Sequence, residues 1–192
     1  MMNNTNVVAM KQASFVNGVN VDLIMGAIES IQADESVAKM QFRANNQWIE
    51  GGLNRSSIKG FSAAGQEDDT RLSAFSYDND EPAILAGEDS APNPVEYLLH
   101  ALAGCLTTTV VYHAAVRGIE IEAVASNLEG DMDLRGLLGL ASDVRKGYHN
   151  VRVTMRVKTS AHADQIRELA MFSPVHEMVS NSLPVNLVVV TY

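Results

Sequence analysis

The chain has 192 residues, enough for one full-sized domain and an additional element, because domains commonly contain about 100 to 150 residues. Its 14 Lys and Arg residues against 23 Asp and Glu residues give a net charge of -9 and a pI near 4.9. Such an acidic protein repels phosphate groups, so neither nucleic acid nor an anionic membrane is expected as a partner. Residues 1–11 lack the basic and apolar regions of a signal peptide, which predicts a cytoplasmic protein.

The first 38 residues are predicted to form a helical extension, and residues 39–192 to form the main domain. Asn20 is a suitable N-cap for a helix that ends near Ile31. The apolar residues of this stretch recur with the spacing of one helix face: Val21, Ile24, Met25 and Ile28.

The main domain is expected to begin with antiparallel strands. The segments Met40–Trp48 and Ser56–Phe61 flank a turn at Gly51 and Gly52, which predicts a hairpin. Residues 64–70 are polar and are expected to form a loop. Residues 71–77 alternate between polar and apolar side chains, as a short strand does.

The clearest predicted element is a long helix that starts at Pro94 and ends before Gly118. Asn93 is the expected N-cap, and Glu96 stands three residues later, as in a capping box. The helix is apolar on nearly all sides, yet it contains histidines and threonines that a bilayer-spanning helix should lack. We therefore predict a helix buried in a globular core.

The second half of the chain predicts a strand pair, two shorter helices and a closing strand. Within residues 119–126 apolar side chains alternate with mainly acidic ones, and within residues 151–158 they alternate with mainly basic ones. The two strands are therefore expected to pair with opposite charges facing each other. The remaining predictions are a loop or short helix within 135–147, a helix over 163–171, a turn or helix capped by Ser173 with Pro174 next, and a strand over Leu187–Val190. This order of elements predicts the α+β class.

Cys105 carries the only thiol of the chain, which excludes an intrachain disulfide. On an ideal helix it shares a face with small, hydroxyl-bearing and apolar neighbours: Leu98, Ala101, Leu102, Thr108, Thr109 and Tyr112. Two interpretations are open, a nucleophilic or redox thiol and a small apolar residue packed in a buried helix. His113 lies about 80° round the helix from Cys105, so a Cys–His pair would be poorly aimed.

No metal or cofactor site is predicted. The five histidines are scattered, without the spacing of a metal site. The glycines follow neither of the standard phosphate-binding patterns. We therefore expect a protein that works without a cofactor.

Residues 93–108, with the sequence NPVEYLLHALAGCLTT, resemble the OsmC/Ohr family, named after osmotically inducible protein C and organic hydroperoxide resistance protein. The Asn-Pro-x-Glu helix start, the small-residue pair and the cysteine carry the resemblance. Residues 172–175 and 183–185 resemble the family's second motif, so the resemblance covers about residues 40–192. It implies antiparallel sheets wrapped around the long central helices of an intertwined homodimer. A second copy would also cover a helix that is apolar on nearly all sides.

In the hydroperoxidases of this family, the helix cysteine attacks the peroxide, a second cysteine closes a disulfide, and an arginine and a glutamate polarise the first thiol. Cys105 matches the first cysteine, whereas Ser173 stands in the place of the second. Val95 occupies the glutamate position. Glu96 is one residue away, about 180° round an ideal helix from Cys105, and resembles the shifted glutamate of single-cysteine relatives.

The family's arginine comes from the first hairpin, where Arg55 is the better match and Arg43 the weaker one. The predicted catalytic residues are therefore Cys105, Arg55 and Glu96. An unassisted cysteine is only about a few per cent ionised at neutral pH. The resemblance, together with the loss of the second cysteine and of the glutamate at its usual position, favours a slow one-cysteine thiol peroxidase. Its partners would be an organic hydroperoxide and an external thiol reductant. The alternative is a non-catalytic dimer that binds a small apolar molecule in the family's pocket.

Overall fold

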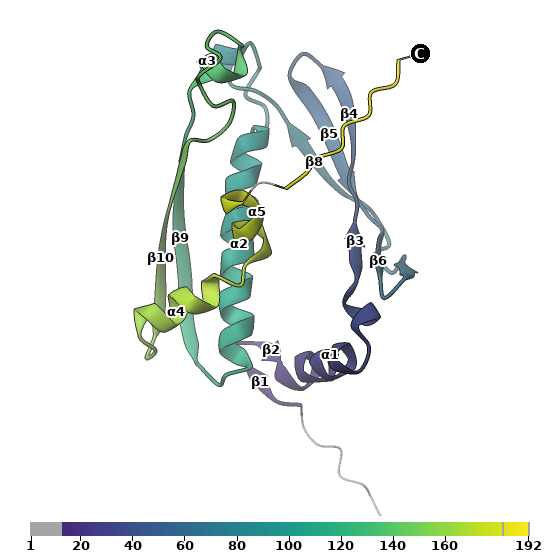
Figure 1. The fold of residues 1–192 in the computed structure, drawn as a ribbon, viewed down its shortest axis with the longest axis vertical. Coiled ribbons are helices and arrows are strands. Elements are labelled where there is room, and N and C mark those ends of the chain that lie inside the picture. The colour runs from purple at the N-terminus through teal and green to yellow at the C-terminus, as the bar shows by residue number, and fades with distance from the viewer. Residues whose placement is uncertain (1–12, 182, 192) are drawn as a thin grey trace, which may run out of the picture.

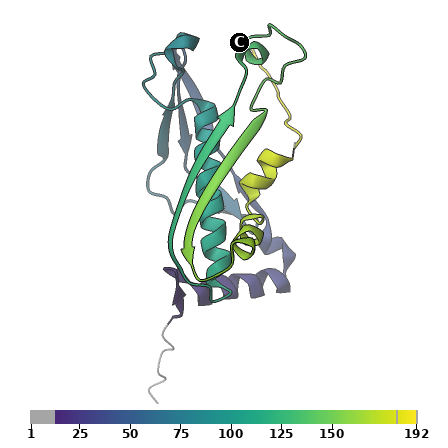
Figure 2. The same cartoon turned by 90° about the vertical axis from the view of Figure 1, so that its left-hand side faces the viewer.

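The computed structural model describes residues 13–181 and 183–191. Helix α2 (Pro94–Ala115) runs through the middle of the molecule (Figure 1). The strands β9 (Ile121–Asp131) and β10 (Asn150–Thr159) lie on one side of α2, and the strands of the N-terminal half lie on the other. Figure 2 shows the β9–β10 pair in front of α2 with the N-terminal strands behind it. The sheets are antiparallel, so the predicted α+β class is confirmed.

The start of α2 confirms the predicted capping box. The side chain of Asn93 accepts a hydrogen bond of 2.9 Å from the N–H of Glu96, and the carboxylate of Glu96 accepts one of 2.9 Å from the N–H of Asn93. Both N–H groups would otherwise lack a partner at the helix end. After the helix, Gly118 has a φ of 67°, a conformation that glycine adopts without strain, and the chain turns toward β9.

The apolar core lies between α2, the β9–β10 pair and α4 (Ala163–Ala170). The buried apolar side chains of the described residues come from α2 and α4: Leu102, Leu106, Val110, Ala114, Ala115, Ile166 and Leu169. By length and composition alone, α2 would also be able to cross a membrane. In this fold one face of α2 packs against α4 and the sheet.

The strands β9 and β10 pair antiparallel, as their charge patterns predicted. Arg152 of β10 binds Glu129 of β9 at 3.1 Å and also binds Asp131. Lys158 binds Glu122. Each of these exposed ion pairs contributes little to stability, so their main effect is to favour this register. The connection between the strands contains α3 (Leu134–Leu137), consistent with the predicted loop or short helix.

The N-terminal half contains two small sheets in place of the single predicted hairpin. In one sheet the order is β3 (Met40–Phe42), β6 (Phe61–Ala63) and β7 (Gln66–Asp68), and in the other it is β4 (Asn45–Glu50), β5 (Leu53–Ile58) and β8 (Phe75–Asn79). The turn at Gly51 and Gly52 is confirmed between β4 and β5. The continuous strand predicted over residues 40–48 is wrong, because the chain passes from one sheet to the other at residues 43 and 44.

The structure corrects two further predictions for this half. The polar loop predicted over residues 64–70 contains β7, because Ala64 and Gly65 have φ values of 51° and 73° and form a tight hairpin turn between β6 and β7. The strand predicted over residues 71–77 is confirmed in part, since β8 begins only at Phe75 and ends at Asn79. Arg71 lies instead over the rings of Phe61 and Phe75, at 5.1 and 5.3 Å, where the cation is attracted to the ring faces.

Asn17 joins the N-terminal residues to the start of β9. This residue lies in the turn between β1 (Phe15–Val16) and β2 (Val19–Asn20), ahead of α1 (Val21–Ala33) and the short helix η1 (Glu35–Ala38). Its side-chain amide donates to the carbonyl of Ile119 at 2.9 Å and accepts from the N–H of Ile121 at 2.8 Å. The predicted cap Asn20 is confirmed, since its side chain accepts from Leu23. Residues 1–12 lie outside the described residues, and the domain boundary after residue 38 stays a prediction.

The C-terminal region confirms two predicted helices and contradicts the predicted closing strand. The helices are α4 and α5 (Pro174–Ser180). The segment Leu187–Val190 belongs to no sheet of the described chain, and its side chains are 74–81% exposed. Its β-branched composition favours a strand, but a strand needs a neighbouring edge to pair with. The described chain supplies none for this segment.

Candidate functional site

Cys105 lies on α2, which packs against both α4 and α5. Its side chain is half-buried. The Oγ of Ser173 lies 3.1 Å from the Sγ of Cys105 and donates a hydrogen bond to it. Ser173 itself is fully buried. The residue that stands in the place of the family's second cysteine is therefore in direct contact with the thiol.

A second hydrogen bond fixes the direction of the Ser173 hydroxyl. The N–H of His176 donates to its Oγ at 3.2 Å, because Ser173 is the N-cap of α5. A serine hydroxyl has one proton to donate and two lone pairs to accept with. Since the backbone N–H occupies a lone pair, the proton is free to point at the sulfur of Cys105.

His113 does not form the Cys–His pair considered from the sequence. Its ring stacks on Phe172, with 4.4 Å between the ring centres, and Arg117 binds its Nδ1 at 3.0 Å. Burial disfavours the charged imidazole and lowers the pKa of His113, and the positive charge of Arg117 lowers it further. His113 therefore acts as a packing residue beside the turn that carries Ser173.

Glu96 is held at the start of α2 by the capping box. It stands nine positions before Cys105, which corresponds to about 13 Å along a helix axis. Val95, at the family's glutamate position, accepts a hydrogen bond of 3.0 Å from the Tyr148 hydroxyl through its carbonyl. The fold of the described chain does not bring Glu96 to the thiol.

Both candidate arginines bind acidic residues of neighbouring strands. Arg55 on β5 makes two hydrogen bonds to the carboxylate of Asp78 on β8, at 2.5 and 2.8 Å. These hydrogen bonds, reinforced by the opposite charges, lower the pKa of Asp78 and raise that of Arg55. Arg43 binds Glu67 in the same way. Among the described residues neither arginine is hydrogen-bonded to Cys105, so the fold of the described chain does not place the polarising arginine expected from the resemblance next to the thiol.

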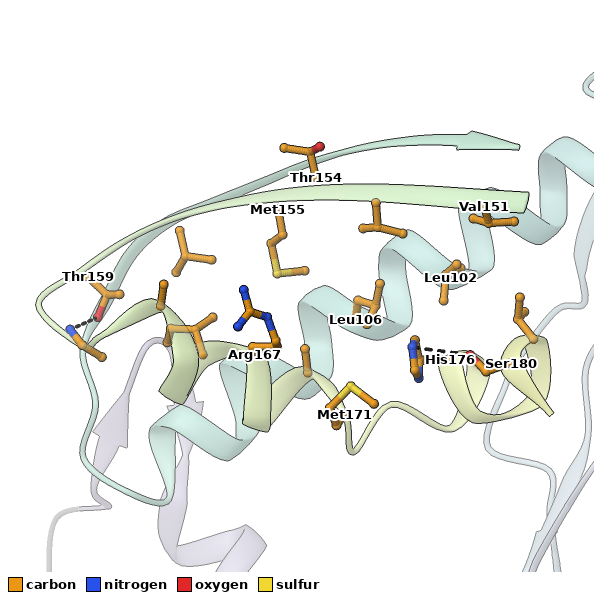
Figure 3. A pocket seen from close by; sticks show the side chains of 17 residues that line it. Leu102, Leu106, Val151, Thr154, Met155, Thr159, Arg167, Met171, His176 and Ser180 are labelled. Atoms are coloured by element: carbon orange, nitrogen blue, oxygen red, sulfur yellow. Dashed lines mark hydrogen bonds between the residues drawn. The ribbon is translucent and has the colours of Figure 1, made fainter. Parts of the chain in front are cut away.

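A cavity of about 750 Å³ lies between β10, α2, α4 and α5 (Figure 3). Leu102 and Leu106 line it from α2 and Met155 from β10, and its polar residues include His176 and Arg167. Cavities of this size and mostly apolar lining accommodate small organic molecules. Cys105 is not among the lining residues, although it lies on α2 between Leu102 and Leu106.

The face of α2 that does not pack on α4 is exposed and carries mostly small residues. We call it the small-residue face; it consists of Leu98, Ala101, Gly104, Thr108 and Tyr112. A Cβ added at Gly104 would meet no atom within 4 Å. The half-buried thiol of Cys105 borders this open surface.

Sequence reasoning missed the contact made by Tyr97 and the contact between Ser173 and Cys105. The hydroxyl of Tyr97 donates to the carbonyl of Asp78 at 2.9 Å, which joins α2 to β8. From the sequence, Ser173 can be identified only as a helix cap, through the Ser-Pro pair, and as the residue that stands in place of a cysteine. Neither observation predicts its contact with Cys105. Within the described residues, no group of three or more His, Cys, Asp or Glu side chains is arranged to hold a metal ion.

Comparisons with known proteins agree with this fold. The sequence model of the family described as OsmC-like protein matches residues 87–188, more than half of the chain. No match was found among curated proteins. An OsmC-like protein from Mycoplasma pneumoniae shares 17% identity, with 74% of this chain and 89% of that chain covered and a TM-score of 0.55. An OsmC-like protein of unknown function from Vibrio cholerae shares 14% identity, with 74% and 93% covered and a TM-score of 0.51. Since identities this low show the fold alone, the family match carries the assignment: the chain belongs to the OsmC-like protein family.

Proposed function

We propose that the protein is a thiol-dependent redox protein, a slow one-cysteine peroxidase that reduces organic hydroperoxides through Cys105. One observation carries this proposal. The only sulfhydryl of the chain is half-buried beside an open helix face, and its sulfur accepts a hydrogen bond of 3.1 Å from a buried hydroxyl. Such a sulfur is both accessible to a small molecule and polarised by a neighbour.

The chemistry proceeds in three balanced steps. The thiolate attacks the terminal oxygen of the hydroperoxide, an S–O bond forms as the O–O bond breaks, and the alcohol leaves after taking up a proton. Cys105 is then a sulfenic acid. Ser173 has no sulfur with which to close a disulfide, so an external thiol attacks the Cys105 sulfur and releases water. A second external thiol attacks the mixed disulfide and regenerates Cys105.

We also propose that the protein acts as a homodimer. The small-residue face of α2 would allow close approach of the same helix from a second copy. Large apolar side chains of the N-terminal half are exposed as well, including Trp48 at 70% and Phe42 at 67%. Arg55 from the second copy is our candidate for the group that polarises Cys105, with Glu96 as the accompanying acid. The acidic composition disfavours nucleic acid and anionic membranes as partners, and the single thiol, which forms no intrachain disulfide, suits the cytoplasmic location that we propose.

The deciding experiment compares Cys105→Ser with the unmodified protein in the turnover of cumene hydroperoxide with dithiothreitol as reductant. We expect the variant to lose turnover completely, because the attacking sulfur is gone. Ser160→Ala, a substitution at an exposed position, is the matched control and should keep full turnover. Unchanged turnover in Cys105→Ser would refute the peroxidase proposal.

The cavity between β10 and α4 favours a second candidate function, the binding of a small apolar molecule without catalysis. An apolar fluorescent dye should then bind the protein, and Cys105→Ser should bind it equally well because Cys105 does not line the cavity. A substitution that fills the cavity, Met155→Trp, should weaken dye binding. Dye binding without peroxide turnover would favour this second function.

A further inference from the structure

The hydroxyl of Ser173 makes two hydrogen bonds, one as acceptor and one as donor. It accepts from the N–H of His176 at 3.2 Å and donates to the Sγ of Cys105 at 3.1 Å. Ser173 is fully buried, so water does not compete for either role. No buried side-chain nitrogen or oxygen atom among the described residues lacks a partner. Without Cys105, the Ser173 proton would have no acceptor among the contacts of this site.

The strength of the bond to sulfur depends on the charge of the sulfur. A hydrogen bond donated to an ionised acceptor is roughly twice as strong as one donated to a neutral acceptor. The Ser173 hydroxyl therefore stabilises the thiolate of Cys105 more than the thiol. It is held in this place by the start of α5 and by the packing of Phe172 on His113.

We infer that Ser173 is a positioning residue for Cys105: its hydroxyl holds the sulfur in place and stabilises the reactive thiolate, from the position where a second cysteine would otherwise close a disulfide. This inference rests on the proposed function. It explains how a chain without the second cysteine keeps a polarised thiol, while the fold of the described chain does not place the polarising arginine next to that thiol. The same hydroxyl stays next to the sulfur of the sulfenic acid until an external thiol arrives.

The first test measures the rate at which iodoacetamide alkylates Cys105 in the folded protein. Ser173→Ala should slow alkylation about tenfold at pH 7, the factor expected when one charge-assisted hydrogen bond is lost. At pH 10, well above the value of about 8.5 at which an ordinary cysteine ionises, the two rates should be similar. Ser160→Ala is the control at both pH values. Equal or faster alkylation of Ser173→Ala at pH 7, or an equal loss at both pH values, would overturn the inference.

A second variant keeps the test decisive if Ser173→Ala folds poorly. Ser173→Cys places a new thiol beside Cys105, and treatment with cumene hydroperoxide should consume both thiols. The peroxide oxidises Cys105 to the sulfenic acid, and the introduced thiol then attacks the Cys105 sulfur, displaces water and forms the disulfide. If the introduced thiol stays reduced after Cys105 is oxidised, the contact between the two positions is contradicted.

These measurements separate the inference from the peroxidase proposal. Alkylation needs neither peroxide nor a reductant, so the pH-dependent effect of Ser173→Ala can appear in a protein that turns over no hydroperoxide. In that outcome the role of Ser173 stands and the peroxidase proposal fails. If turnover is lost in Cys105→Ser but unaffected in Ser173→Ala, the peroxidase proposal stands and the role of Ser173 fails.

Discussion

The two halves of the chain differ in how they hide their apolar side chains. From residue 87 onward, α2 and α4 supply all the buried apolar side chains of the described chain. Between residues 13 and 86, the buried residues that the structure describes are Asn79 and Asp80, both polar. Trp48 on β4 remains 70% exposed. The second half therefore has a core of its own, whereas the described part of the first half contains no buried apolar side chain.

Hydrogen bonds, rather than a packed core, attach the first half of the chain to the second. The carboxylate of Asp80 accepts from the N–H and the hydroxyl of Ser90 at 3.0 and 2.8 Å and from the N–H of Glu81 at 2.8 Å. These bonds, led by the one from the Ser90 N–H, lower the pKa of Asp80. Tyr97 adds its bond to Asp78, and Asn17 fixes the opposite end. A few polar contacts at two ends thus position sheets that gain little from packing.

The largest predicted effect is the loss of stability when an acidic residue is placed in the core of the second half, compared with an acidic residue placed in the first half. Val110→Asp buries an unpaired carboxylate in the core and should lower the free energy of unfolding by about 4 kcal/mol or more. Leu72→Asp changes a side chain that is 99% exposed and should cost less than about 0.5 kcal/mol. Urea denaturation of both variants measures the difference. Comparable losses would mean that the halves are stabilised alike.

The attachment of the extension is tested at Asn17. Asn17→Ala loses both hydrogen bonds to the start of β9 and places alanine at a φ of 54°, so we expect a loss of about 2–3 kcal/mol. Asn17→Gly loses the same bonds but accommodates the positive φ, so its loss should be about 1 kcal/mol smaller. Thermal unfolding of the two variants gives the comparison. Identical melting temperatures for both variants and the unmodified protein would show that the extension is not held there.

The open face of α2 provides the next prediction. Gly104→Leu meets no atom within 4 Å at its first side-chain carbon, so each protomer should fold normally. The larger side chain should prevent close approach of a second α2 and weaken dimerisation at least about tenfold, which sedimentation or gel filtration detects. Gly26→Leu on α1 has equally open surroundings and is the matched control. A Gly104→Leu variant that dimerises normally would refute the proposed contact between the helices.

The smallest predicted effect concerns pH. The pKa of His113 lies below its usual value near 6.5, so the folded protein favours the neutral ring more than the unfolded chain does. The resulting stability is present above about pH 6.5 and is lost as the pH falls through the lower folded value. His113→Phe keeps a ring beside Phe172 but cannot titrate. Its unfolding free energy should therefore decline less between pH 7.5 and pH 5 than that of the unmodified protein.

Local signals account for most of the correct sequence predictions. The capping box at Asn93 and the Ser173-Pro174 pair each specify a helix start through neighbouring residues. The failed predictions depend on unusual turn residues or distant partners. The sequence predicts a loop in place of the β6–β7 hairpin because Ala64 is an unusual turn residue, and residues 187–190 have the composition of a strand without an edge to join.

The candidate site divides in the same way. Cys105 can be found from the sequence, because its helix motif resembles the family's. Its contact with Ser173 spans 68 positions and becomes visible only once α5 packs against α2. Arg55 follows from the family's pattern, but its pairing with Asp78 depends on which strand adjoins β5. The sequence identifies the candidate residues of this site, but it does not identify the residues that contact them in the folded chain.

The bare segment Leu187–Val190 has a consequence for handling the protein. Four consecutive apolar residues, three of them β-branched, are exposed and carry no charge to discourage contact. Such runs are templates for backbone pairing between molecules and are a common origin of aggregation. The protein should therefore aggregate more readily as its concentration rises unless this run is covered. An acidic substitution such as Val189→Glu should raise the concentration at which the protein precipitates.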